Sequence, residues 1–341
     1  MTEDDSRREI PLVLTGPESG IDSASDSIVP AIVTEAGPNA RFAYEEFFAG
    51  LNSVHTIKSY RRAVHRFLSH CGRQSLALHQ VSPRVVADYI QRLDNRSRRN
   101  AGRPLSKPTR KVHLAAIRLF LDHCVQRHAI VLNPALSVRG PRHSVTEGKT
   151  PALDPRDARA LLDSIGCIRP IDLRDRAIIA TLIFTAARVG AVAKLCRADF
   201  FSDGRQFYLR FDEKGDKQRV IPVRHDLQLL IEQYFDECPF ADASDPVFLT
   251  AAGRTGKLLP RRMGANDMLR MVKRRLLAAG LPATSLCCHS FRAGTATNLL
   301  EQGVDPAEVQ YLLGHSDPRT TRLYDRRQLR VSRNIVERIA V

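Results

Sequence analysis

Apolar and polar positions recur with a helical period from about residue 40 to residue 140. In the run TIKSYRRAVHRFLSHCG, one helical face collects the apolar side chains Tyr60, Val64, Phe67 and Leu68. Ser82 and Pro83 predict the start of a second helix, because serine caps a first turn and proline fits its first position. A third run, TRKVHLAAIRLFLDHCVQRH, is also helical in period. We therefore expect a compact helical domain whose exposed faces are rich in arginine and lysine.

The stretch VRGPRHSVTEGKTPAL has the Gly, Pro and charge content of a linker, which we place at residues 141–152. A second domain, 153–341, then begins with a helix that Asp154 caps and Pro155 opens. FYLRFD and QRVIPV alternate in character and flank EKGDK, which predicts a β-hairpin with Gly215 in its turn. Helices are further expected at 226–237, 262–279, 291–302, 305–314 and 325–339. The expected fold class is mainly α with a small β-sheet, in two domains.

Residues 1–39 mix Ser, Gly, Pro and acidic residues without a sustained period, which predicts a disordered acidic tail ahead of a helical domain at 40–140. The N-terminus is acidic where a secretory signal would be basic and then apolar, and no apolar run approaches the ~18 residues of a membrane span. The seven cysteines form no CxxC pair. We expect a cytoplasmic protein with reduced cysteines and no membrane partner.

The net charge of +15 is concentrated outside the tail, because acidic residues outnumber arginines within residues 1–39. A body this basic favours a polyanionic partner, most simply DNA, since neutralising phosphates releases counterions. A generally basic surface without such a partner is the alternative that charge alone leaves open.

Two arginines stand in apolar surroundings. Arg188 follows the run AIIATLIFTAA, and Arg292 lies in the small, apolar stretch FRAGTATNLL. A buried guanidinium is costly unless an anion accompanies it. Two forked guanidiniums could hold both non-bridging oxygens of one phosphate, including during charge build-up in a transition state. Alternatively, each arginine could pair with a buried carboxylate.

Other side chains suited to phosphate chemistry lie between and after these arginines in the sequence. His289 stands three residues before Arg292 and would share its helical face. His315 follows a glycine at a helix end, Tyr324 lies nine residues further on, and Lys214 is at the mouth of the predicted hairpin. Each has an ordinary alternative: a structural hydrogen bond for a histidine, solvation for a turn lysine, packing for a tyrosine. The order and spacing of all these residues together indicate phosphate chemistry more strongly than any one of them does alone.

A zinc site would have to draw on His289, His315 and the neighbouring Cys287 and Cys288. Their spacing contains no short ligand pair such as CxxC or HxxxH. We therefore expect no metal.

Taken together, these motifs resemble those of the tyrosine recombinases, also called the phage integrase family. TAARVGAVAKL is similar to the family's first arginine motif, EKGDKQRVIPV to its lysine hairpin, CHSFRAGTAT to H-x-x-R, and LGHSDPRTTRLY to the stretch from LGH to the tyrosine. The resemblance covers roughly residues 40–341. One departure is Ala191, where the family often has an acidic residue, so its orienting contact must come from elsewhere or be absent.

The resemblance implies a two-domain clamp on DNA, with a SAM-like helical core-binding domain and an α+β catalytic domain. It implies that Tyr324 is the nucleophile and forms a 3′-phosphotyrosyl link without metal, ATP or another cofactor. Arg188 and Arg292 would stabilise the transition state, and Lys214 would protonate the leaving oxygen. The implied roles of the histidines are acid/base chemistry at the tyrosine for His289 and a hydrogen bond to the phosphate for His315.

The partners implied by the resemblance are double-stranded DNA recombination sites, accessory proteins, and copies of the same chain in a homo-tetramer that passes through a Holliday junction. The apolar face of LRVSRNIVERIAV would dock on a neighbouring protomer or, equally, on its own domain. Two alternative functions are type IB topoisomerase-like relaxation and non-catalytic DNA binding with the same fold. The filled catalytic positions and the LGH motif favour the recombinase.

Overall fold

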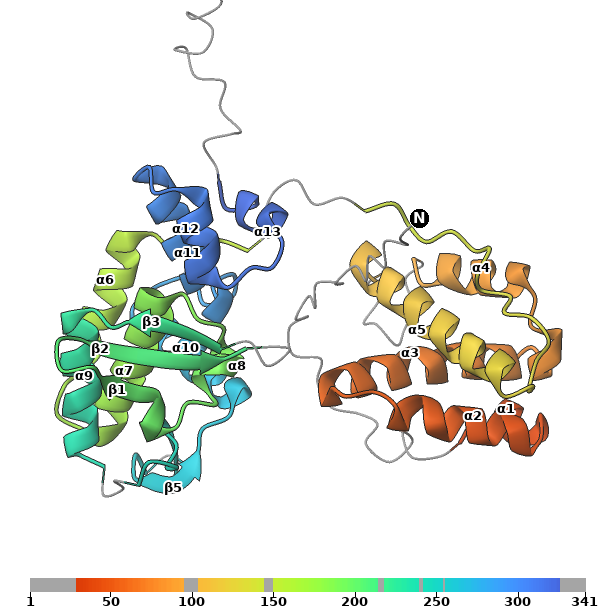
Figure 1. The fold of residues 1–341 in the computed structure, drawn as a ribbon, viewed down its shortest axis with the longest axis horizontal. Coiled ribbons are helices and arrows are strands. Elements are labelled where there is room, and N and C mark those ends of the chain that lie inside the picture. The colour runs from red at the N-terminus through yellow and green to blue at the C-terminus, as the bar shows by residue number, and fades with distance from the viewer. Residues whose placement is uncertain are drawn as a thin grey trace, which may run out of the picture. The chain divides into compact units, whose positions relative to one another are not determined.

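The computed structural model describes residues 29–94, 104–143, 150–213, 218–238, 242–253 and 255–325. The chain divides into two compact units, Met1–Ser144 and Val145–Val341 (Figure 1). Each unit has its own hydrophobic core. The hairpin turn with Lys214 and Gly215 lies outside the described residues, as does nearly all of the helix expected at 325–339. None of the helices in the described ranges is both long and apolar enough to cross a membrane.

The first unit is a bundle of helices. Its elements are α1 (Ala31–Glu35), α2 (Pro38–Ala49), α3 (Val54–Gly72), η2 (Leu78–Gln80), α4 (Pro83–Arg92) and α5 (Lys107–Gln126). Helix α5 packs against both α2 and α3, and the fully buried Phe67 and Phe120 lie in the core that they share. The Ser82 side chain accepts a hydrogen bond from the backbone N–H of Val85, which confirms the predicted start of α4. The predicted helical domain is thus present.

Helix α1 and the first residues of α2 fall within the tail that the sequence predicted to be disordered, so that prediction was wrong for residues 31–35 and 38–39. The side chains of Ile32 and Val33 are buried in the core of the first unit, at 4% and 0% exposure. A five-residue helix has no sustained period to detect, and its order comes from tertiary burial.

The second unit combines helices with two small antiparallel sheets. Its helices are α6 (Pro155–Asp163), α7 (Pro170–Thr185), α8 (Val189–Val192), η4 (Arg197–Asp199), α9 (His225–Asp236), α10 (Ala265–Ala278), α11 (Cys288–Glu301), α12 (Pro306–Leu313) and α13 (Pro318–Arg322). The strands are β1 (Phe200–Ser202), β2 (Phe207–Asp212) and β3 (Gln218–Pro222) in one sheet, and β4 (Leu249–Ala251) and β5 (Leu258–Arg262) in the other. The antiparallel β2–β3 pairing confirms the predicted hairpin strands. The helix expected at 262–279 corresponds to α10, which begins only at Ala265. Arg262, the first residue of the expected helix, is instead the last residue of strand β5.

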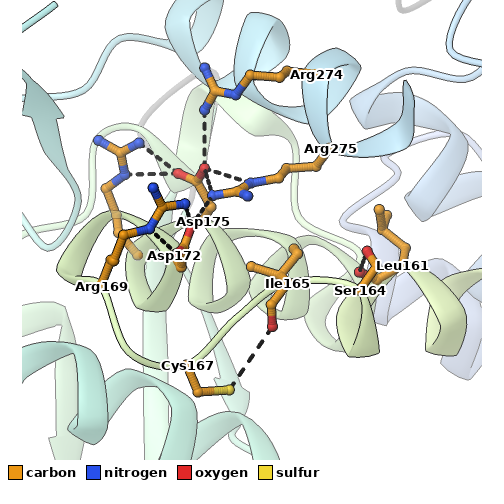
Figure 2. A network of polar contacts seen from close by, with 10 residues as sticks. Leu161, Ser164, Ile165, Cys167, Arg169, Asp172, Asp175, Arg274 and Arg275 are labelled. Carbon is orange, nitrogen blue, oxygen red and sulfur yellow. Dashed lines mark hydrogen bonds and ion pairs between the residues drawn. The ribbon is translucent and has the colours of Figure 1, made fainter. Parts of the chain in front are cut away.

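Helix α7 is held to α10 by a network of ion pairs (Figure 2). The carboxylate of Asp175, fully buried on α7, lies 2.8 Å from Nη2 of Arg275 and 3.1 Å from Nη2 of Arg274, both on α10. The same Arg275 nitrogen lies 2.6 Å from Oδ1 of Asp172, one turn earlier on α7. Removing one member of such a network leaves a buried charge uncompensated, so these pairs fix the position of α7.

Helix α11 passes very close to the chain that enters the second unit. The Leu153 N–H donates to the Ser290 carbonyl at 3.1 Å. A Cβ atom at Gly294 would lie 2.2 Å from the Leu153 carbonyl oxygen. Only glycine fits this contact, which explains part of the small-residue run in FRAGTATNLL and sets the position of the first turn of α11.

Candidate active site

The structure brings together every predicted site residue in its described part, where α7, α12 and α13 end and α11 begins. These residues are Arg188, His289, Arg292, His315 and Tyr324. Arg188 caps α8 directly after the end of α7, and His289 and Arg292 lie in the first turns of α11. Lys214, the sixth, lies outside the described residues, immediately after Glu213.

Arg292 is buried and is held by main-chain oxygens. Its Nη1 donates to the Ala186 carbonyl at 2.7 Å and its Nη2 to the Leu313 carbonyl at 2.6 Å. These carbonyls end α7 and α12, where helix dipoles favour a cation. Burial, followed by the charge of Arg188, lowers the pKa of Arg292 to about 10. No carboxylate in the described ranges forms an ion pair with Arg292, and its buried Nε has no hydrogen-bond partner there.

Arg188, in contrast, has a carboxylate partner. Its Nη1 donates to Oε2 of Glu213 at 2.6 Å. The Glu213 side chain is 8% exposed, whereas that of Arg188 is 46% exposed. The paired alternative left open by the sequence therefore holds for Arg188, although the guanidinium keeps donors that face solvent.

Tyr324 lies against the first turn of α11. Its Oη is 3.1 Å from Nε2 of His289, and its carbonyl accepts a hydrogen bond from Oγ1 of Thr297 at 3.3 Å. The side chain is buried at 8% exposure. Burial raises the pKa of Tyr324, and that rise is opposed by the charge of Arg292, by a hydrogen bond with the Arg292 side chain and by the charge of Arg188. The phenol therefore sits beside a proton acceptor and within the field of two cations.

His315 also packs against the ring of Tyr324. Its ring is parallel to that of Tyr324, with 6.0 Å between centroids and 7° between planes. Its Nδ1 lies 2.9 Å from Oγ1 of Thr321 on α13. Gly314, which ends α12 in the left-handed conformation with φ of 61°, turns the chain so that His315 can reach this position, as the sequence predicted for a helix end.

Both histidines are held neutral by their surroundings. His289 is exposed as a whole residue, but local desolvation of its ring, then the charges of Arg292 and Arg188, lowers its pKa to about 4. Burial, then the same two charges followed by those of His289 and Arg219, lowers the pKa of His315 to about 3. A neutral imidazole beside Tyr324 can accept the phenolic proton, which an imidazolium could not.

Three arginines lie close enough to the two histidines or to Tyr324 to affect the pKa of at least one of these side chains. Arg188, Arg219 and Arg292 act on this region, and Glu213 is the one carboxylate that pairs with any of them in the described ranges. Among these four side chains, three positive charges stand against one negative charge. An oxyanion with several oxygens, such as a phosphodiester, suits the half-exposed donors of Arg188 and the unpartnered Nε of Arg292.

Sequence reasoning missed Glu213, Arg219 and Thr321. Arg219 is 6% exposed, and its Nη2 donates to Oε1 of Glu213 at 2.9 Å. The alternation of β3 contained a signal, because Arg219 shares the inward face with Ile221. Within the described ranges, no group of three or more His, Cys, Asp or Glu side chains is arranged to hold a metal ion.

Comparison with known proteins agrees with this geometry. The phage integrase family model matches residues 151–329, and the phage integrase N-terminal SAM-like domain matches residues 45–128. The tyrosine recombinase XerC of Actinobacillus succinogenes is 30% identical over 276 residues, which cover 80% of this chain and 86% of that protein. The tyrosine recombinase XerD of Listeria innocua is 29% identical over 281 residues, covering 80% and 88%.

Among solved structures, the XerH site-specific recombinase in a post-cleavage complex with palindromic difH substrate has a similar fold, with a TM-score of 0.65 and 20% identity over 82% of this chain and 80% of that one. A λ integrase tetramer bound to a Holliday junction is similar at a TM-score of 0.59 and 14% identity, covering 84% and 78%. The chain therefore belongs to the phage integrase family and, like its curated relatives, is a tyrosine recombinase that cleaves and rejoins DNA.

Proposed function

We propose that Tyr324 is the nucleophile of this recombinase and that His289 takes its proton. The observation that carries the proposal is the 3.1 Å contact between Tyr324 Oη and His289 Nε2, next to a buried arginine without a carboxylate partner. In the cleavage step, Tyr324 Oη forms a bond to the scissile phosphorus while the bond from phosphorus to the 5′ oxygen breaks. The products are a 3′-phosphotyrosyl link and a free 5′-hydroxyl.

The remaining site residues handle charge and the leaving group. Arg188 and Arg292 bind the non-bridging oxygens as negative charge builds on them, and His315 donates a hydrogen bond to the phosphate. Lys214, directly after Glu213 in the chain, protonates the departing 5′ oxygen. These cations supply the charge stabilisation, and the phosphotyrosyl ester conserves the bond energy for rejoining, so the step draws on neither metal nor ATP.

The partner proposed for both units is double-stranded DNA carrying recombination sites. Helix α3 supports this for the first unit, because Lys58, Arg61, Arg62 and Arg66 lie on it and its 19 residues include no acidic residue. Affinity from such contacts falls steeply with salt. We further propose that four chains act on two duplexes and that strands exchange through a Holliday junction. The protein would work in the cytoplasm on nucleoid DNA, and accessory proteins would select which two recombination sites are paired.

Covalent capture tests the nucleophile and identifies the target site in one experiment. The full chain is incubated with a library of duplexes that have randomised arms and a nick near the cleavage position. Cleavage releases the short fragment with its 5′-hydroxyl, so rejoining fails and the protein stays linked to DNA. Mass spectrometry then locates the linked residue, and sequencing of the captured duplexes identifies the site.

Capture of DNA on Tyr324 and its loss in Tyr324→Phe is the expected result. An adduct that persists in Tyr324→Phe would overturn the assignment of the nucleophile. No adduct from any member of the library would overturn the proposed cleavage step. With the captured site in hand, exchange between two such duplexes separates recombination from relaxation of supercoils alone.

A further inference from the structure

The contact between Arg188 and Glu213 joins residues 25 positions apart. Ala191, one turn after Arg188, provides no acidic group of its own and is 7% exposed on α8. Glu213 instead reaches Arg188 from the end of β2, across the mouth of the β2–β3 hairpin. The only carboxylate that orients the half-exposed guanidinium, among the residues that the structure describes, is thus supplied by the hairpin.

Each oxygen of Glu213 binds a different arginine. Oε2 accepts from Nη1 of Arg188 at 2.6 Å, and Oε1 accepts from Nη2 of Arg219 at 2.9 Å. Arg219 is buried, and burial lowers its pKa while the charge of Glu213 opposes that shift. A carboxylate divided between two guanidiniums, one buried, has little freedom to rotate. Glu213 therefore orients Arg188 while Arg219 holds Glu213 in place.

The same carboxylate is tied to the end of α12. Arg219 Nη1 donates to the carbonyl of Leu312, next to Leu313, whose carbonyl holds Arg292. A Cβ atom at Gly314 would lie 2.6 Å from Oε2 of Glu213. Gly314 thus leaves the space that the carboxylate occupies as well as providing the turn before His315. Through these contacts the two phosphate-binding arginines are held against one main-chain segment.

We propose that Glu213 is a positioning residue for Arg188 in the cleavage step. This inference rests on the proposed function, because it assigns Glu213 a role through Arg188 at the scissile phosphate. Glu213 touches no reacting atom. Its contribution is to hold one guanidinium where the phosphate binds while leaving the solvent-facing donors of that guanidinium available.

The test compares Glu213→Gln with Asp212→Asn on the duplex obtained by covalent capture. Asp212 is the neighbouring, exposed residue and loses the same charge, so it is a matched control. Single-turnover cleavage should slow roughly 10- to 100-fold in Glu213→Gln, as is usual when an orienting partner is lost, and should stay unchanged in Asp212→Asn. Non-covalent DNA affinity, measured in a Tyr324→Phe background, should change little in either.

A double-mutant cycle distinguishes positioning from a merely structural role. If Glu213 acts through Arg188, the double variant Glu213→Gln with Arg188→Ala should cleave no more slowly than Arg188→Ala alone. A duplex whose scissile phosphate is replaced by a neutral methylphosphonate should also abolish the difference between Glu213→Gln and the unaltered chain. Multiplicative losses, or a defect that persists on the neutral duplex, would overturn the inference.

Folding of the variant is controlled by a second substitution. If Glu213→Gln unfolds because Arg219 loses its partner, Glu213→Gln with Arg219→Met removes both members of the buried pair, which is tolerated far better than removing one. The outcome is separate from that of the proposed function: cleavage by the unaltered chain, lost in Tyr324→Phe and retained at full rate in both Glu213 variants, would refute this inference alone.

Discussion

Nε2 of His289 lies 3.1 Å from Oη of Tyr324, so the proposed base and nucleophile belong to the same chain. Arg292, one turn after His289 on α11, is also provided by that chain. Within the described residues, these candidate site side chains are therefore brought together by one chain in the second unit, which predicts that cleavage takes place in cis.

Mixing two inactive variants tests this arrangement. Tyr324→Phe lacks the nucleophile, and Arg292→Ala lacks a phosphate-binding group, which costs roughly 10²- to 10³-fold in rate for a comparable oxyanion-binding donor. We expect their equimolar mixture to form no more covalent adduct than Arg292→Ala alone. Recovery of adduct in the mixture would mean that one chain supplies its tyrosine to the arginines of another.

The two active-site histidines should remain neutral at pH values well below the usual pKa of a histidine side chain. Their pKa values of about 4 for His289 and about 3 for His315 lie below the ~6.5 of an unfolded chain. Histidine NMR titration of the full chain without DNA should show both rings neutral at pH 5.5. A midpoint near 6.5 for either ring would show that solvent and nearby charges do not keep that ring neutral.

The same shifts determine how stability depends on pH. Between the folded and unfolded pKa values the unfolded chain binds more protons, so stability is greatest above about pH 6.5 and falls as the pH is lowered from there toward 4. His315 contributes at most about 1.4 kcal/mol per pH unit within that window, and the more exposed His289 contributes less because solvent screens its charge. Unfolding temperatures of the unaltered chain from pH 4.5 to 7.5 should decline on acidification.

Gly294→Ala should destabilise the second unit. The added methyl group would lie 2.2 Å from the carbonyl oxygen of Leu153, so either α11 or the entering chain must shift, at a cost of about 1–3 kcal/mol. Gly190→Ala is the matched control, because a Cβ atom there meets nothing within 4 Å and alanine favours a helix. Urea unfolding of the full chain measures both, and equal stabilities would disprove the close approach.

Asp175→Asn tests the network in Figure 2. The substitution removes a buried charge that Arg174, Arg274 and Arg275 share, and we expect a loss of about 3–5 kcal/mol in the stability of the second unit. Asp267→Asn, which breaks the exposed pair with Arg270, should cost less than about 1 kcal/mol. Similar losses for the two variants would show that the buried network does not hold α7 to α10.

The sequence was most informative where chemistry and local rules coincide. Asp154 and Ser82 cap helices as predicted, and the order of His289, Arg292 and Tyr324 indicated a common site before any geometry was known. The caps are local signals, because a cap acts within one turn, whereas Tyr324 lies 35 residues after His289 and was assigned to the same site through the resemblance to the family's motifs.

Long-range pairing could not be predicted in this way. The partner of Arg188 is 25 residues away, and the choice of Glu213 depends on how β2 approaches α8. Short elements such as α1 and α13 were missed for a related reason, since five residues carry no period and gain order from contacts elsewhere. Arg219 was predictable in part. The alternation of β3 indicates that its side chain points inward, but no local pattern indicates that Glu213 is its partner.

The main-chain hold on Arg292 has a consequence for how this site tolerates change. Its two acceptors are the carbonyls of Ala186 and Leu313, which every amino acid possesses, so substitutions at those positions leave the acceptors in place as long as the backbone keeps its path. Arg188 depends instead on the side chain of Glu213. The orientation of Arg292 therefore tolerates substitutions at the positions that it contacts, whereas Arg188 can lose its orientation through a single substitution at Glu213.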